Sequence, residues 1–142
     1  MQIRRLVAGD EESACEIARR FKSAQADKGH LARFLADERN YLVAAHVDDD
    51  LAGFILGYEL PRIDGARPMM LLYEIGVLAD QRRRGIGRAL VGQLKQVCQE
   101  RGIRKMFVLT EQSNAAAMAL YTSTGGDRDA GNTVMFEYTF AE

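Results

Sequence analysis

The feature that most constrains the fold of this 142-residue chain is a crossover near its middle. Residues 69–78 are almost continuously apolar, which is typical of a strand buried on both faces. A basic turn follows, then apolar residues at helical spacing from Ile86 to Gly102, and then a second apolar run over 103–109. A strand, a crossover helix and a second strand make a parallel pair. The sequence therefore predicts a sheet with a parallel pair, and it places the basic turn where open α/β sheets bind ligands.

The other segments predict an α+β fold built around this crossover. The spacing of apolar residues predicts, in chain order, a strand at 2–6, a helix beginning at Asp10, a short helix at 30–36, a hairpin of 41–47 and 51–60, a helix capped by Ser113 that runs through 121, and a last strand at 133–140. No repeat, low-complexity tract or linker divides the sequence. We expect a single domain over residues 1–142, with a mixed, mostly antiparallel central sheet flanked by about four helices.

The basic turn has the composition of a pyrophosphate site. It reads Arg82-Arg83-Arg84-Gly85-Ile86-Gly87-Arg88 and opens directly into the helix. The first backbone N–H groups of a helix have no hydrogen-bond partner within the helix, and the helix macrodipole adds positive charge at the same end. Arginine side chains can also donate two parallel hydrogen bonds to the oxygens of one phosphate. The Gly-Lys-Ser/Thr of a Walker loop is missing, and Leu90 stands where a dinucleotide fingerprint needs its third glycine. An ordinary solvated turn is the alternative interpretation.

Composition excludes several other classes of function. The net charge of −1 gives no general attraction to nucleic acid or to a membrane surface, so the arginines are a local feature. No secretory leader opens the sequence and no apolar run approaches about 20 residues, so we expect a cytoplasmic protein. The two cysteines and two histidines lack the spacing of metal ligands, so we expect no metal.

With this turn after one apolar strand and the segment 114–121 after the next, the chain resembles the GCN5-related N-acetyltransferases. Their pyrophosphate loop, Arg/Gln-x-x-Gly-x-Gly/Ala, is matched by Arg82, Gly85 and Gly87. Within that superfamily the chain is similar to the aminoglycoside 3-N-acetyltransferases of the same fold in Leu60-Pro61, Tyr73-Glu74-Ile75-Gly76-Val77 and Ala119-Leu120-Tyr121-Thr122. The resemblance implies the fold of this superfamily, with a splayed parallel pair of strands. It also implies that the protein uses acetyl-CoA as cosubstrate and a small-molecule amine as acceptor. Antibiotic resistance would be the outcome of the reaction, and a homodimer is a frequent assembly.

The resemblance also implies how acetyl-CoA is held. Main-chain amides from Arg83 to Arg88 would hold the pyrophosphate. Backbone groups of Ile75, Gly76 and Val77 would pair with the pantetheine amides where a β-bulge splays the strands, and a glycine suits such a bulge. The N–H near Val77 would also donate to the developing oxyanion. Asn114 would contact the CoA arm, although an asparagine in the first turn of a helix is just as often a cap.

Transfer of an acetyl group to an amine needs a base, because amines in water are mostly protonated near neutral pH. Glu74 is the candidate, since strand alternation places it on one face with Met70 and Leu72, in an apolar run. A buried structural acid is one alternative, and electrostatic attraction of the amine is another. The resemblance implies Tyr121 as proton donor to the leaving thiolate, with a core aromatic as the alternative. Glu137, in an aromatic late strand, is the further acid expected to bind a cationic acceptor.

Three functions remain open on the sequence. The first is an acetyl-CoA-dependent acetyltransferase acting on an aminoglycoside amine. The second is an acetyltransferase for another small amine or a protein N-terminus. The third is a CoA-binding regulatory module without catalysis, and the presence of both Glu74 and Tyr121 argues against it.

Overall fold

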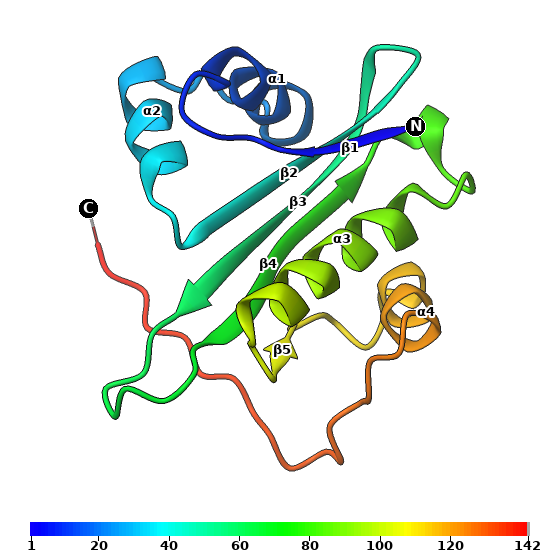
Figure 1. The fold of residues 1–142 in the computed structure, drawn as a ribbon. Helices are drawn as coiled ribbons and strands as arrows, with labels where there is room; N and C mark the ends of the chain where they lie inside the picture. The colour runs from blue at the N-terminus through cyan, green and yellow to red at the C-terminus, as the bar shows by residue number, and fades with distance from the viewer. Residues whose placement is uncertain (142) are drawn as a thin grey trace.

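The computed structural model describes residues 1–141, which form a five-stranded sheet with helices on both faces (Figure 1). The elements are β1 (Gln2–Arg5), α1 (Glu11–Lys22), α2 (Lys28–Ala36), β2 (Asn40–Val47), β3 (Asp50–Leu60), β4 (Met69–Val77), a short 3-10 helix η1 (Ala79–Gln81), α3 (Ile86–Arg101), β5 (Met106–Phe107) and α4 (Ala115–Ser123). The strands lie in the order β1-β2-β3-β4-β5, antiparallel throughout except for the parallel pair β4–β5. This confirms the predicted α+β class and mixed sheet.

Two hydrophobic clusters pack on the two faces of this sheet. Alternate residues of β2 and β3 face opposite sides, so Val43 and Ile55 pack beneath α3, whereas Leu42 and Phe54 pack against α1 and α2. Both sets are buried, which explains why these strands are unbroken apolar runs in the sequence. Helix α4 lies beside α3, where Lys95 donates a 2.7 Å hydrogen bond to the Thr124 carbonyl.

Two predicted strands differ from the structure. The strand predicted at 103–109 is reduced to β5, because it pairs only with Met70 and Leu71 at the start of β4. The strand predicted at 133–140 is absent, since residues 127–141 carry neither helix nor strand. An extended segment becomes a strand only when another strand pairs with it, and no strand of the described chain pairs with this one.

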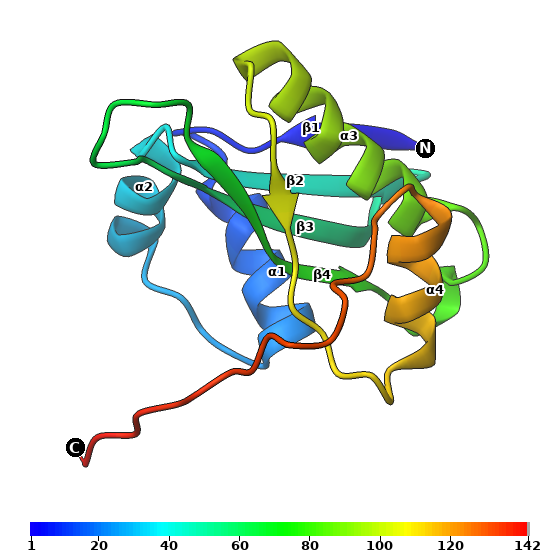
Figure 2. The ribbon, with the colours of Figure 1, turned by 90° about the horizontal axis from the view of Figure 1, so that it is seen from below.

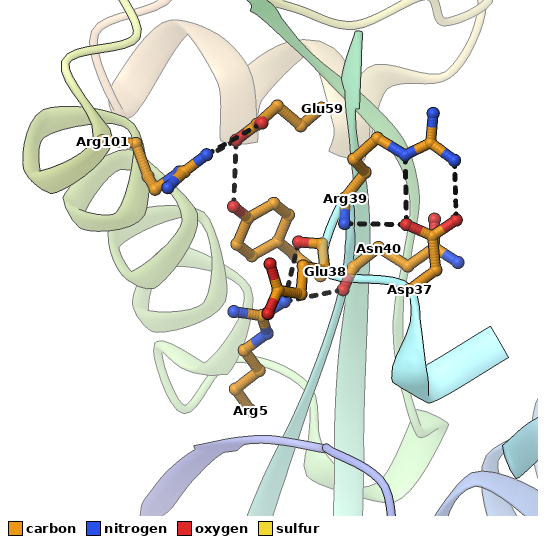
Figure 3. Close-up of polar contacts among 8 residues, drawn as sticks. Arg5, Asp37, Glu38, Arg39, Asn40, Glu59 and Arg101 are labelled. Atoms are coloured by element: carbon orange, nitrogen blue, oxygen red, sulfur yellow. Dashed lines mark hydrogen bonds and ion pairs between the residues drawn. The ribbon is translucent and has the colours of Figure 1, made fainter. Parts of the chain in front are cut away.

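A buried acid, Glu59, ties β3 to the end of α3 (Figure 3). Its side chain is only 8% exposed. Arg101 donates two hydrogen bonds of 3.0 Å to its carboxylate oxygens, and the Tyr41 hydroxyl donates a third, also of 3.0 Å. The Arg101 hydrogen bonds are the main reason that the pKa of Glu59 lies below its ordinary value. Glu59 therefore contributes to stability as a charged group.

Replacing Glu59 with glutamine is expected to lower the free energy of unfolding by about 1–2 kcal/mol at neutral pH, because Arg101, itself half-exposed, loses its charged partner. The folded-state pKa lies below the ordinary value of 4.5, so this stabilisation is present above that pH and is lost as the pH falls through the folded-state pKa. Thermal melts of both proteins at decreasing pH check the prediction, since the difference in Tm should close on acidification. A difference that stays constant with pH would contradict it.

Candidate active site

The basic turn forms a cradle of backbone donors at the start of α3. Helix η1 leads from β4 into the turn, in which Arg83 and Gly85 have positive φ angles of 64° and 78°. Gly85 is the N-cap of α3 and offers no side chain to the first amides of the helix. The arginines at 82, 83 and 84 are exposed around it. The turn therefore keeps both its backbone N–H groups and its positive charge available to an anion.

The two glycines of this cradle are present for different reasons. An added Cβ at Gly85 would meet nothing within 4 Å, so its positive φ, and not lack of space, favours glycine there. Gly87 has no positive φ, and an added Cβ would meet only Leu120, at an ordinary contact distance of 3.5 Å. The fold itself therefore tolerates alanine at position 87, and the bare backbone there is open to a ligand.

Strand β4 has an open edge beside the cradle. Its pairing with β5 stops at Leu71 and Phe107, so within residues 1–141 the later part of β4 pairs on one side only, with β3. The backbone of Ile75, Gly76 and Val77 is thus free to pair with an extended ligand on the β5 side. This is the geometry that the predicted contacts with pantetheine require.

A β-bulge in β4 sets the direction of Glu74. The register with β3 shifts by one at Tyr73, which is an extra residue on β4. Met70 and Leu72, before the bulge, pack beneath α3, whereas Glu74, after it, faces the other side and forms an ion pair with Lys22 of α1. The prediction that Glu74 shares a face with Met70 and Leu72 is wrong, because the extra residue reverses the alternation.

The bulge also lies earlier than the resemblance implied, at residue 73 and not within 75–77. Gly76 has a different explanation. An added Cβ there would lie 2.9 Å from the rings of both Phe21 and Phe54, so the close approach of two aromatic side chains excludes any larger residue.

Glu74 lines a pocket of about 380 Å³ between β4 and the chain that follows β5. The lining residues are one acid, one lysine and four apolar or aromatic residues: Lys22, Leu71, Leu72, Tyr73, Glu74 and Leu109. The ring of Tyr73 lies 5.3 Å from that of Tyr58, whose pKa is raised mainly by burial and further by Tyr73 and the charge of Glu74. Sequence reasoning missed Lys22, Tyr58 and Leu109, because no local pattern links these distant segments.

Tyr121 lies on the other side of the sheet from Glu74. Its side chain packs against the cluster beneath α3, and burial raises its pKa above the ordinary value of 10. Glu74 faces α1, so the two predicted catalytic side chains do not touch.

Asn114 and Glu137 differ from the arrangement predicted for them. The Asn114 side chain accepts a 3.1 Å hydrogen bond from the Ala117 N–H and caps α4, so the capping alternative is confirmed and the predicted cap at Ser113 is wrong. Glu137 lies on the exposed segment after α4, not on a strand, and it is not among the residues that line the Glu74 pocket.

A larger hollow of about 630 Å³ surrounds Arg5, Glu59 and Arg101. Its central acid, Glu59, already forms an ion pair with Arg101, so these two charges are paired with each other. Over residues 1–141, no helix combines the length and apolar character needed to cross a membrane. In the same residues, no three His, Cys, Asp or Glu side chains gather as metal ligands.

A helix start with free amides, an open strand edge beside it and a carboxylate in the adjoining pocket therefore lie next to one another. The chain belongs to the Acetyltransferase (GNAT) family, whose model matches residues 9–125. This span includes the cradle, Glu74 and Tyr121, and it ends before the exposed C-terminal segment.

Known proteins of this kind resemble the chain in different ways. Over 54 residues it is 43% identical to the ribosomal protein bS18-alanine N-acetyltransferase of Escherichia coli K12, a match that covers 38% of this chain and only 36% of that protein. The fold superposes on the aminoglycoside acetyltransferase meta-AAC0020 from a soil metagenome, in complex with sisomicin, with a TM-score of 0.89 at 24% identity over 99% of this chain and 96% of the other. It superposes on AAC(6')-Iy in complex with CoA with a TM-score of 0.79 at 20% identity, over 99% and 95% of the two chains.

Proposed function

We propose that this chain transfers the acetyl group of acetyl-CoA directly to an amine of an aminoglycoside, with the 3-amino group as the position that the sequence resemblance implies. The observation that carries the proposal is the position of Glu74, a partly buried carboxylate that pairs with Lys22 in a pocket lined elsewhere by apolar and aromatic residues, beside the open edge of β4. The similarity of fold to an aminoglycoside acetyltransferase over nearly the whole chain supports it.

Each group of the site has a defined part in this reaction. Acetyl-CoA supplies the acetyl group as an activated thioester. The amides and arginines at the start of α3 hold its pyrophosphate. Glu74 takes a proton from the protonated amine, so that the neutral nitrogen can attack the thioester carbon and form the C–N bond. Tyr121, which its raised pKa keeps protonated, donates a proton to sulfur as the C–S bond breaks.

The second proposed function is acetylation of a protein N-terminus. The 43% identity to a ribosomal protein-alanine acetyltransferase over 54 residues favours it. The pocket favours it too, because its one acid, already paired with Lys22, offers too little negative charge for the several positive charges of an aminoglycoside and suits the single charge of a peptide α-amine better. Glu137, which the sequence analysis assigned to the cationic acceptor, is not in this pocket.

Release of CoA thiol from acetyl-CoA separates these functions. We expect turnover with sisomicin and little with a short peptide that begins with alanine, and NMR of the product then identifies the acetylated nitrogen. Turnover with the peptide alone would establish the second function. Binding of acetyl-CoA without turnover on any amine would contradict both and leave a CoA-binding module.

Replacing Tyr121 with phenylalanine is expected to lower kcat about tenfold, a modest loss because a thiolate, with a thiol pKa near 8.5, leaves readily without a proton. Burial holds the pKa of Tyr121 above 10, so the loss should be the same at all pH values of an ordinary assay. Steady-state kinetics from about pH 6 to 9 check this. An unchanged kcat would assign Tyr121 to the core.

A further inference from the structure

The last turn of α1 is held against β3 and β4 by an aromatic contact. The ring of Phe21 lies 4.8 Å from that of Phe54 in β3, and Gly76 of β4 lets both rings approach because it has no Cβ. The helix ends at the next residue, Lys22, where Ser23 takes a left-handed φ of 51°. The fold thus fixes a lysine where α1, β4 and the chain that follows β5 come together (Figure 2).

This lysine places a primary amine inside the candidate active site. Lys22 is the one residue lining the Glu74 pocket that carries an amine, and its Nζ forms an ion pair with the Glu74 carboxylate. The backbone proposed to pair with pantetheine begins one residue further along β4, at Ile75, so the thioester would lie beside this pair. An ammonium group therefore already touches the carboxylate that is proposed to deprotonate an acceptor amine.

A second lysine–glutamate pair shows what is particular about this one. Lys28 contacts Glu12 at 3.0 Å, and the Glu12 side chain is 88% exposed, so this is an ordinary surface pair. The Glu74 side chain is only 24% exposed, and Lys22 reaches it inside a pocket. Because Lys22 is itself half-exposed, the pair adds little stability, and stability alone is a weak reason for a lysine in this pocket.

We propose that the chain acetylates its own Lys22 at Nζ, a step that rests on the proposed function. The Lys22 ammonium gives one proton to Glu74, which releases it to solvent. The neutral nitrogen then bonds to the acetyl carbon of acetyl-CoA as the C–S bond breaks. The nitrogen loses a second proton and the leaving sulfur gains one, so the products are an N-acetylated lysine, CoA thiol and one proton.

Acetylation of Lys22 changes the charge of the pocket. The acetyl group removes the positive charge of the lysine, so Glu74 loses its partner. Glu74 is then the one charged residue among those that line the pocket. A cationic acceptor meets an unpaired carboxylate and has no lysine to displace from it. Self-acetylation thus converts the pocket from a balanced ion pair to a site with a net negative charge.

Mass spectrometry of the chain with acetyl-CoA and no acceptor amine tests the proposal. We expect a gain of one acetyl group per chain, which peptide mapping places at Lys22 and at none of the other three lysines. Lys22→Arg should abolish the gain. Lys28→Arg is the matched control, because it also replaces a lysine paired with a glutamate, and it should still gain one acetyl group. Equal labelling of all four lysines would show a spontaneous reaction with the thioester and overturn the proposal.

Two further measurements show whether the chain modifies itself with its own site. With saturating acetyl-CoA, the fraction of chains modified in a given time should not change on dilution of the protein, because the reaction lies within one chain. Glu74→Gln should lose the label at Lys22, whereas Glu16→Gln, which removes an acid paired with Arg19, should keep it. A fraction that falls in proportion to the protein concentration, or a label that survives Glu74→Gln, would overturn the proposal.

Calorimetry without acetyl-CoA tests the effect on the acceptor. Lys22→Gln is neutral, like the acetylated lysine, whereas Lys22→Arg keeps the charge beside Glu74. We expect the glutamine variant to bind sisomicin about two- to fivefold more tightly than the arginine variant, which is the effect of losing one partly exposed competing ion pair. If the peptide that begins with alanine is the accepted amine, it replaces sisomicin. Equal affinities would overturn the effect of acetylation on the pocket.

Failure of this inference and failure of the proposed function give different results. Turnover of an acceptor amine by a chain whose Lys22 stays unmodified would overturn the inference and leave the proposed function in place. Binding of acetyl-CoA with neither turnover nor a label at Lys22 would count against the proposed function, and the inference would be overturned with it.

Discussion

Replacing Glu74 with glutamine is expected to lower kcat for acetyl transfer about 100-fold near neutral pH, because an amide cannot accept the proton of the attacking amine. Glutamine has the same shape, so the pocket and its apolar walls stay in place. The loss should shrink as the pH rises, since the amine then loses its proton to water before it reacts. Profiles of rate against pH for both proteins, with acetyl-CoA and the accepted amine, check this result.

The control for this prediction is Glu16→Gln. It removes a carboxylate from an ion pair with Arg19, at 3.6 Å, on the same helix that carries Lys22, and it should leave kcat unchanged. Glu74→Gln should hardly change the Tm, because its partner Lys22 is half-exposed and such pairs contribute little. A raised KM with unchanged kcat would assign Glu74 to attraction of the amine and contradict its role as base.

Replacing Gly87 with alanine is expected to weaken acetyl-CoA binding about 10- to 100-fold while leaving the protein as stable as before, or more so. The added methyl group would stand in the first turn of α3 and hold a phosphate away from the backbone amides, at a cost of about 1.5–3 kcal/mol for hydrogen bonds to a charged group. Within the fold it meets only Leu120, at 3.5 Å. Calorimetry with acetyl-CoA, beside a thermal melt, separates the two effects.

Gly92→Ala is the matched control for this substitution. Gly92 lies in the same helix, and an added Cβ there meets nothing within 4 Å. Both variants gain helix propensity, by about 1 kcal/mol for glycine to alanine, so both should melt at or above the wild-type temperature. Only Gly87→Ala should bind acetyl-CoA more weakly. Equal affinity of the two variants for acetyl-CoA would show that the pyrophosphate does not bind at this helix start.

Most of the fold could be predicted because the sequence patterns that define its helices and turns each lie within a few neighbouring residues. The spacing of apolar residues located the helices and the β2–β3 hairpin, and Gly102 caps α3 with a φ of 71°, as its position predicts. The cradle was predicted for the same reason. Free amides at the first turn of a helix and adjacent arginines need no distant partner to define them.

The candidate site could be predicted only in part. The sequence identified Glu74 as an acid in an apolar strand, but the extra residue Tyr73 reverses the side that Glu74 faces, and the bulge is visible only in the register with β3. Lys22 and Leu109 reach the pocket from α1 and from the chain after β5. No spacing along the sequence relates these residues, because the folded sheet alone brings them together.

The sequence by itself determined that an apolar strand runs into a basic turn and that this turn begins a helix, because backbone preferences, caps and hydrophobic spacing are local properties. Only the tertiary structure decided that Glu74 faces α1 and that residues 133–140, despite their strand-like sequence, pair with no strand within residues 1–141. Strand pairing joins segments far apart in the sequence, so its register and its partner depend on the assembled sheet.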